Sequence, residues 1–377
     1  MAKKQENLGE FLTESLNKKF KKTLGQNQTV YFLDGNGESP NNITDWVSTG
    51  VTHLDMAISN RVGGGLPVGR IVELMGLEQS GKSLLAGHIT ANTQKKGGIV
   101  VYIDTEMSLD SRFLRAIGVD VSKMLYVPLQ TIEDIFEAME DIIIKIREKD
   151  KDRLVTIIVD SVAGATTKME EAADYSRDGY STAKAILMGK SMRKLTNLIG
   201  KQKILCVFTN QLRDKMNAMA FGEKYTTPGG KALQFHCSVR LKLQNIGRLK
   251  GKVNGVDEII GQQVQVTVVK NRLGPPNRKV KYSVYYDSGI DDADSLLKVL
   301  KEYKIVKASG PVSKCVNIET GEEHTFYARD FKALLEKDPE LKAQLLKQLS
   351  ENYIMLYSHE VAIERDPDEI EVDTKDE

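Results

Sequence analysis

The segment Gly76–Ser83, which reads Gly-Leu-Glu-Gln-Ser-Gly-Lys-Ser, constrains this chain more than any other feature. It fits the pattern GxxxxGK[ST], in which glycines let backbone N–H groups turn inward around phosphate oxygens. Lys82 would reach the β- and γ-phosphates of a nucleotide, and the Ser83 hydroxyl would ligate Mg²⁺. The pattern needs a strand before it and a helix after it, and Arg70–Met75 and Ser83–Lys95 are predicted to be these elements. The predicted nucleotide ligands here are Gly76, Leu77, Glu78, Gln79, Ser80, Gly81, Lys82 and Ser83.

Strands and helices alternate around this segment. The runs Gly98–Asp104, Leu154–Val159 and Ile204–Thr209 are almost continuously apolar, which is typical of buried strands. Between them, Thr131–Arg147 and Ser181–Lys201 carry apolar residues at helical spacing, and Thr131 is placed to cap the first of these helices. Such an order predicts an α/β fold with a buried, mostly parallel sheet and helices on both faces.

The pattern changes after about residue 236. In Cys237–Leu243, Val264–Val268 and Val280–Tyr286, apolar and polar residues alternate. Alternation is typical of strands with one buried and one solvent-exposed face, so these runs predict antiparallel strands added to one edge of the sheet.

Length and pattern together predict a core with smaller parts at both ends. A chain of 377 residues is long enough to form two domains. Apolar residues at helical spacing between Leu8 and Phe20 predict an amphipathic helix, which has to pack on this chain's body or on a neighbour. Asp338-Pro339 predicts a helix start in a small α/β C-terminal domain. The predicted parts are an N-terminal helical segment (1–45), an α/β core that holds the nucleotide motif (46–290), the C-terminal domain (291–358) and an acidic disordered tail (359–377).

The charge balance and the cysteines exclude several classes. With 53 basic and 52 acidic residues, the net charge is +1, so any surface for nucleic acid has to be local. The three cysteines contain no CxxC pair, which argues against a disulfide framework or structural zinc and suits the cytoplasm. No apolar run approaches the roughly 18 residues of a membrane span.

Polar residues end three of the predicted strands. Asp160 follows a buried strand and is expected to anchor the Mg²⁺ shell. Asp104 and Glu106 both end the strand from Gly98, and either could polarise an attacking water; spacing does not choose between them. Asn210-Gln211 ends the strand from Ile204, and an amide there could contact a γ-phosphate and lose it after hydrolysis. Each of these side chains could instead be an ordinary hydrogen-bonded residue at a strand end.

Basic residues gather in three places. The segment Leu212–Lys231 is predicted to be a long, basic, structureless loop, which is either functional or a tolerated surface insertion. The helix Ser181–Lys201 carries bases on its outer face, which is either solvated or a phosphate-tracking groove. Lys270 and Arg272 follow an alternating strand and could reach a phosphate of their own subunit or of the next.

These motifs together resemble the RecA family of recombinases. They occur in family order with nearly family spacing from about Val47 to Ile290, and a looser likeness extends over both ends of the chain. The matching segments are Gly65–Glu73 running into Gly76–Ser83, Tyr102–Glu106, Val159–Ala163, Met192–Leu195, Asn210–Arg213, Thr226–Leu233, Ser238–Leu241 and Val269–Arg272.

The resemblance implies roles for individual residues at the ATP site. Glu106 matches the general base for the attacking water, and Gln211 matches the γ-phosphate sensor. Asp110 and Phe113 fall where the family holds the adenine. Lys270 and Arg272 match the pair that reaches the ATP of the adjacent subunit.

The resemblance also implies a DNA-dependent ATPase, with ATP and Mg²⁺, that forms a helical filament on single-stranded DNA and pairs it with homologous duplex DNA. The two DNA-binding loops correspond to about Glu171–Gly179 and Leu212–Gly230, and the N-terminal helix would pack on the neighbouring subunit. Single-strand-binding protein and loader proteins are further candidate partners. Arg193, Arg213, Gly229 and Gly230 match positions that contact DNA.

Some positions depart from the family pattern. Phe113 stands where a tyrosine is common and Pro228 where a threonine is common, both loops are slightly longer, and Pro311–Val316 lacks an aromatic-rich turn. These differences fit a phage-encoded or otherwise divergent member. The alternatives are a DNA motor or repair ATPase, of the helicase or RadA type, and a DNA-filament scaffold that does not hydrolyse ATP. The expected extra domains of a helicase or a RadA-type ATPase are not seen in this sequence, which argues against the first alternative. The intact residues Lys82, Glu106 and Asp160 argue against the second.

Overall fold

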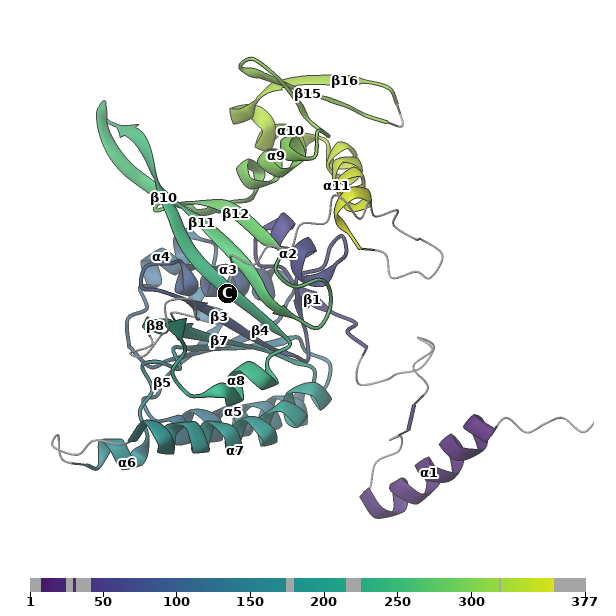
Figure 1. Cartoon of the computed structure of the whole chain (residues 1–377), viewed down its shortest axis with the longest axis vertical. Helices are drawn as coiled ribbons and strands as arrows, with labels where there is room; N and C mark the ends of the chain where they lie inside the picture. Colours follow the sequence, from purple (N-terminus) through teal and green to yellow (C-terminus); the bar gives the residue numbers. More distant parts are fainter. Residues whose placement is uncertain are drawn as a thin grey trace, which may run out of the picture. The chain divides into compact units, whose positions relative to one another are not determined.

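A computed structural model describes most of the chain (Figure 1). The chain divides into two compact units, residues 1–44 and 45–377. The first contains α1 (Leu8–Leu24), the predicted amphipathic helix, and the Asn17 side chain exchanges hydrogen bonds of 2.8 and 3.0 Å with the backbone of Val30. On α1, the side chains of Leu8, Phe11 and Leu12 are exposed. The described residues are 8–24, 30–31, 42–173, 180–214, 225–318 and 320–355.

The second unit is built around a sheet that has nine strands among the described residues, in the order β13-β12-β11-β10-β3-β7-β6-β4-β5. From β3 to β5 all neighbours are parallel, as predicted. The pairings β10–β11, β11–β12 and β12–β13 are antiparallel. The strands are β3 (Ile71–Gly76), β4 (Ile99–Asp104), β5 (Met124–Pro128), β6 (Val155–Asp160), β7 (Ile204–Gln211), β10 (Val239–Val253), β11 (Val256–Asn271), β12 (Lys279–Tyr285) and β13 (Gly289–Asp291).

The three alternating runs form the predicted antiparallel extension, since β10 pairs antiparallel with β11. The extension joins the sheet differently from the prediction, because β10 lies parallel to β3, with Val239 beside Val72 and Leu243 beside Gly76. Val239 and Leu243 are fully buried. Alternation reports which face of a strand is buried and does not report its direction. Beyond Leu243 the strand continues with β11 as a ribbon that projects from the sheet (Figure 1).

Helices cover both faces of the sheet, because successive residues of each strand point to opposite faces. One buried cluster joins Val72, Leu74 and Val100 to α3 (Lys82–Lys95) and α2 (Thr52–Ser59). The other joins alternate strand residues to α5 (Ile132–Lys149) and α7 (Tyr180–Lys201), which lie along one side of the sheet in Figure 1. The expected cap is confirmed, since Thr131 Oγ1 accepts the Asp134 N–H at 3.2 Å. The apolar stripe predicted for α7 is also confirmed: Met188, Met192, Leu195 and Ile199 are buried.

Short elements complete the core. They include a pair of strands before the nucleotide segment and another pair at the base of the second predicted loop. These elements are β1 (Trp46–Val47), β2 (Leu66–Pro67), α4 (Ser111–Ala116), α6 (Lys168–Glu171), β8 (Arg213–Asp214), β9 (Tyr225–Thr226), α8 (Lys231–His236) and the 3₁₀ turns Val121–Lys123 and Ala328–Asp330.

The C-terminal part is a small α/β arrangement. Asp338 Oδ1 accepts the Leu341 N–H at 2.9 Å and Pro339 occupies the first turn, so the predicted helix start is confirmed. The Arg278 guanidinium lies 4.4 Å from the centre of the Tyr353 ring and attaches this part to the core. Its elements are α9 (Asp292–Glu302), β14 (Lys307–Ser309), β15 (Val312–Val316), β16 (Glu323–Tyr327), α10 (Phe331–Lys337) and α11 (Pro339–Tyr353).

Candidate functional site

The residues predicted for the ATP site on β3, β4, β6 and β7 come together at the carboxyl ends of these parallel strands. All strands of a parallel sheet have their carboxyl ends on the same side, and ligands of such sheets bind in the crevice outside these ends. The register places Gly76 of β3 directly beside Gln211 of β7, and Asp104 of β4 beside Asp160 of β6. Four segments that are far apart in the sequence therefore contribute their polar residues to one place.

The loop Gly76–Gly81 has the geometry of a phosphate cradle. A Cβ atom on Gly76 would lie 2.4 Å from Ser80 Oγ and 2.6 Å from the Leu243 carbonyl oxygen, so only glycine fits there. Gly81 has φ of 92°, a left-handed conformation, immediately before α3 begins at Lys82. The remaining residues of the loop, Leu77, Glu78 and Gln79, are exposed. A loop of exposed residues that leads into the N-terminus of α3 suits a bound phosphate.

Lys82 lies across this loop. Its Nζ donates hydrogen bonds to the carbonyl oxygens of Gly76 at 3.1 Å and Leu77 at 2.7 Å. Partial burial lowers the pKa of Lys82, and the nearby carboxylates of Asp160 and Glu106 oppose that shift. Lys82 is therefore held within the electrostatic reach of both predicted acids.

Asp160 is fixed by two hydroxyl groups. Its Oδ2 accepts from the Tyr102 hydroxyl at 2.7 Å and its Oδ1 from Thr209 Oγ1 at 2.5 Å. Burial and the Asp160 charge raise the pKa of Tyr102 well above its usual value, so the phenol stays a donor. No cluster of three potential metal-binding side chains occurs in the described parts of the chain. One carboxylate and the exposed Ser83 hydroxyl fit Mg²⁺, which is usually held by few protein ligands together with substrate phosphates.

Asp104 and Glu106, between which residue spacing did not choose, have different surroundings in the structure. The Asp104 carboxylate accepts the backbone N–H groups of Glu106, Met107 and Ser108, each at 3.0 Å. Asp104 is almost fully buried and serves as the cap of this turn. Glu106 is exposed, and its Oε1 accepts a 2.8 Å hydrogen bond from Ser161 Oγ. Of the two acids, Glu106 is thus the one free to face a substrate.

The two predicted adenine-binding residues lie at α4. Asp110 caps this helix by accepting the Arg112 N–H at 2.8 Å, and the Arg112 guanidinium lies 2.9 Å from its other oxygen. The hydrogen bond from the Arg112 side chain lowers the pKa of Asp110. Phe113 is half-buried against Leu114 and Ile117. An exposed carboxylate at the N-cap and an aromatic residue in the first turn therefore lie three positions apart at one short helix.

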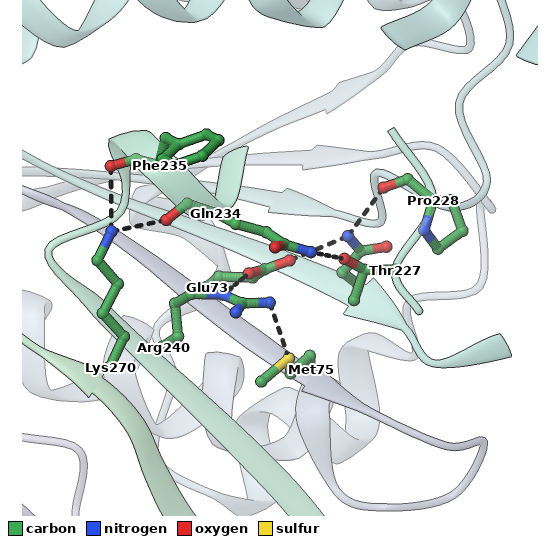
Figure 2. Close-up of polar contacts among 9 residues, drawn as sticks. Glu73, Met75, Thr227, Pro228, Gln234, Phe235, Arg240 and Lys270 are labelled. Atoms are coloured by element: carbon green, nitrogen blue, oxygen red, sulfur yellow. Dashed lines mark hydrogen bonds and ion pairs between the residues drawn. The ribbon is translucent and has the colours of Figure 1, made fainter. Parts of the chain in front are cut away.

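Lys270 and Arg272 contact the C-terminal end of α8 in their own chain. Lys270 Nζ donates to the carbonyl oxygens of Gln234 at 2.7 Å and Phe235 at 3.1 Å, as Figure 2 shows. Arg272 also donates to the Phe235 oxygen at 3.1 Å. Carbonyl groups at a helix C-terminus attract cations. Burial lowers the pKa of Lys270, and the neighbouring Arg272 adds to that shift.

The predicted DNA-binding residues fall into two groups. Arg213 pairs with Thr226 in the β8–β9 ladder, so the base of the second loop is ordered, contrary to the structureless loop that was expected. Gly229 and Gly230 have φ of 88° and 74° and pack against α7: a Cβ atom on Gly230 would lie 3.0 Å from Ala185 Cβ. Arg213, Gly229 and Gly230 thus share one region.

Arg193 belongs to the other group. It lies near His236, whose pKa is lowered by burial and by the charges of Arg193, Arg272 and Lys270. Thr196 Oγ1 of the same helix lies 2.8 Å from His236 Nδ1, so Arg193 lies on the part of α7 beside the end of α8 that Lys270 and Arg272 contact.

Sequence reasoning missed Lys184. Its Nζ donates to the Ala165 carbonyl oxygen, and burial together with the nearby charge of Arg213 lowers its pKa. Lys184 thus adds a base between the two predicted loops. Its position one helical turn before Met188, on the inward side of α7, was the available signal. Most of the first predicted loop (174–179), the centre of the second (215–224) and the acidic tail lie outside the described residues.

Comparisons with known proteins agree with this geometry. A family model described as the RecA N-terminal domain matches residues 12–291. Protein RecA of Clostridium acetobutylicum is 34% identical over 309 residues, which cover 82% of this chain and 83% of that protein. Protein RecA of Gluconobacter oxydans is 38% identical over 274 residues, 73% of this chain and 75% of its own. Protein RecA of Rhodopirellula baltica is 39% identical over 274 residues, 73% and 69% of the two chains. In the described residues, every helix is too short or too polar to cross a bilayer.

Proposed function

This chain belongs to the RecA family of DNA-dependent ATPases that act in recombination and repair, and on this premise we propose how its own residues do the work. The observation that carries the proposal is that Lys82, Glu106, Asp160 and Gln211 meet at the carboxyl ends of the parallel strands. They lie beside the base of the second predicted loop, which is basic. A motor or repair ATPase of another kind is not favoured, because the family match covers most of the chain.

ATP is held by the loop Gly76–Ser83, with the adenine between Asp110 and Phe113. Lys82 leaves its two carbonyl partners to bind the β- and γ-phosphates, which are stronger acceptors than a neutral carbonyl. Mg²⁺, when bound by Ser83 and Asp160, would neutralise the charge of the phosphates. Glu106 accepts the proton of the attacking water, and Gln211 contacts the γ-phosphate and reports its loss.

The ATP site is shared between neighbouring subunits. Lys270 and Arg272 reach the phosphates bound by the adjacent subunit and exchange the carbonyl groups of α8 for them. The filament is therefore the active form, and α1 packs on the neighbour through its exposed apolar side chains.

DNA is bound by the two loops and by Arg193, Arg213, Gly229 and Gly230. Basic side chains and backbone N–H groups contact the phosphates of a single strand, and base pairing with a homologous duplex supplies the specificity. Three buried free thiols, Cys206, Cys237 and Cys315, suit a reducing cytoplasm. Single-strand-binding protein and loader proteins are partners on the strength of the family resemblance alone.

The decisive experiment measures ATP hydrolysis with and without single-stranded DNA, in the wild type and in Lys82→Ala. We expect strong stimulation by DNA in the wild type and none in the variant. Hydrolysis that ignores DNA would contradict the recombinase function and favour a motor. DNA binding without any hydrolysis would favour the filament scaffold.

A further inference from the structure

Asn210 lies immediately before the predicted γ-phosphate sensor Gln211 in β7, so the two side chains point to opposite faces of the sheet. The Asn210 side chain is fully buried. Its Nδ2 donates to Glu73 Oε1 at 3.0 Å and to the carbonyl oxygen of Pro228 at 3.2 Å. Asn210 therefore joins the core sheet to the segment 225–230, which we call the loop exit.

Glu73 is fixed by a buried ion pair with Arg240. Arg240 Nε lies 2.6 Å from Glu73 Oε2, and the side chains are 13% and 0% exposed (Figure 2). Arg240 also contacts Met75 Sδ at 3.2 Å. A buried carboxylate that accepts from a guanidinium and an amide at once has little freedom to move. The pair joins β10, which carries Arg240, to β3, where Glu73 lies three residues before Gly76. It forms a rigid support for Asn210.

The amide of Asn210 can adopt only one orientation here. Its Nδ2 faces two acceptors, so a flip would place Oδ1 against the Glu73 carboxylate and the Pro228 carbonyl. Oδ1 itself is buried, and no donor of the described residues reaches it. An unpaired buried acceptor is unfavourable, so a shift of the loop exit that brings a donor to Oδ1 would be stabilised.

The loop exit is also connected to the cations that are proposed to reach the next subunit. Gln234 Nε2 donates to Thr227 Oγ1 at 3.1 Å, and the Gln234 carbonyl oxygen accepts from Lys270 Nζ at 2.7 Å (Figure 2). A displacement of Thr227 and Pro228 therefore acts on the helix whose end holds Lys270.

We propose that Asn210 is a positioning residue that couples the nucleotide state sensed at Gln211 to the loop exit, with the Glu73–Arg240 pair as its fixed support. The essential contact is the hydrogen bond from Asn210 Nδ2 to Pro228. This inference rests on the proposed function, because it takes Gln211 to face the nucleotide and the loop to bind DNA.

Two variants separate this coupling from mere structural support. Asn210→Asp removes both N–H donors and places a carboxylate against Glu73, which should lower stability. Adding Glu73→Gln reverses the polarity of one contact: the new amide N–H can donate to the carboxylate introduced at position 210, and the amide oxygen can still accept from Arg240. The double variant thus restores the support but not the hydrogen bond to Pro228. Asn352→Asp, on the exposed end of α11, is the matched control.

The readouts are the melting temperature, hydrogen exchange of residues 225–236 with and without a non-hydrolysable ATP analogue, and ATP hydrolysis with and without poly(dT). We expect the analogue to slow exchange about tenfold in the wild type and the control. The double variant should regain stability while losing both this protection and the DNA stimulation.

Each other outcome counts against a specific claim. Wild-type protection and stimulation in the double variant would show that Asn210 is only structural. If the analogue gives the wild type no protection, the coupling is also refuted. Protection in the wild type without DNA stimulation would contradict the proposed function alone, because the exchange readout needs no DNA.

Discussion

Ser161 Oγ donates a 2.8 Å hydrogen bond to Glu106 Oε1, across 55 residues of sequence. Ser161 directly follows Asp160, so the residue proposed to bind Mg²⁺ and the residue that contacts Glu106, the proposed general base, are neighbours in the chain. A carboxylate that accepts a hydroxyl at one oxygen keeps the other oxygen available for water. The residues proposed as the general base and as the Mg²⁺ ligand are thus joined through Ser161.

Glu106→Gln should lower kcat for DNA-stimulated hydrolysis by about 10²–10⁴-fold, because the amide cannot accept the proton of the water. ATP-dependent binding of single-stranded DNA should persist, since the nucleotide still binds. Ser161→Ala should lower kcat roughly tenfold, because the loss of one hydrogen bond to Glu106 is expected to raise the barrier by that amount. Steady-state hydrolysis and DNA anisotropy measure both effects. Normal turnover in Glu106→Gln would remove this residue from the mechanism.

Asp104→Asn should impair catalysis indirectly. The buried carboxylate accepts three backbone N–H groups, and an amide in its place presents its own N–H to at least one of them. The turn that carries Glu106 should shift, lowering kcat by roughly tenfold while the Kd for ATP stays the same. Titration with a fluorescent ATP analogue, next to turnover assays, tests this. A loss of ATP binding instead would assign Asp104 to the nucleotide itself.

Mixing two inactive variants should restore activity if the ATP site is shared. Lys82→Ala loses its own phosphate site but keeps Lys270 and Arg272, whereas the double variant Lys270→Ala/Arg272→Ala has the opposite defect. In a mixed filament, intact halves meet at a fraction of the interfaces. Hydrolysis should therefore rise above the sum of the separate variants.

The control is a mixture of the Lys82→Ala protein with the Glu106→Gln protein, because both defects lie in the half of the site that one subunit contributes. This mixture should stay inactive. Equal recovery in both mixtures, or none in either, would argue against cross-subunit cations.

His88 should make stability depend on pH. Burial, with a smaller contribution from the charge of Lys95, lowers its pKa from 6.5 to about 4, and its Nε2 accepts the Ile290 N–H at 3.1 Å. Only neutral histidine can accept this bond, so its contribution is complete above pH 6.5 and is lost as the pH falls through about 4. His88→Gln keeps an acceptor that does not titrate, so Tm should fall less steeply between pH 7 and about 4. Parallel Tm profiles would exclude His88 as a source of the acid sensitivity.

Much of the fold and of the site was predictable from the sequence. The strand and helix on either side of Gly76–Gly81, the parallel strands, the α7 stripe and the Asp338 cap all depend on residues that are close together in the chain, and the structure confirms them. Such local patterns report burial and capping directly. The family itself follows from the order of these motifs.

Other features were decided by contacts between distant residues. The direction of β10, the hydrogen bond from Ser161 to Glu106, and the position of Arg193 near His236 depend on how whole elements pack. Asn210 meets Glu73 across 137 residues, and Glu73 meets Arg240 across 167. Periodicity along the chain tells which face of an element is buried, but the partner on that face is chosen only when the sheet assembles. The order of residues therefore sets the chemistry available to this protein, and the packing of distant elements selects which side chains act together.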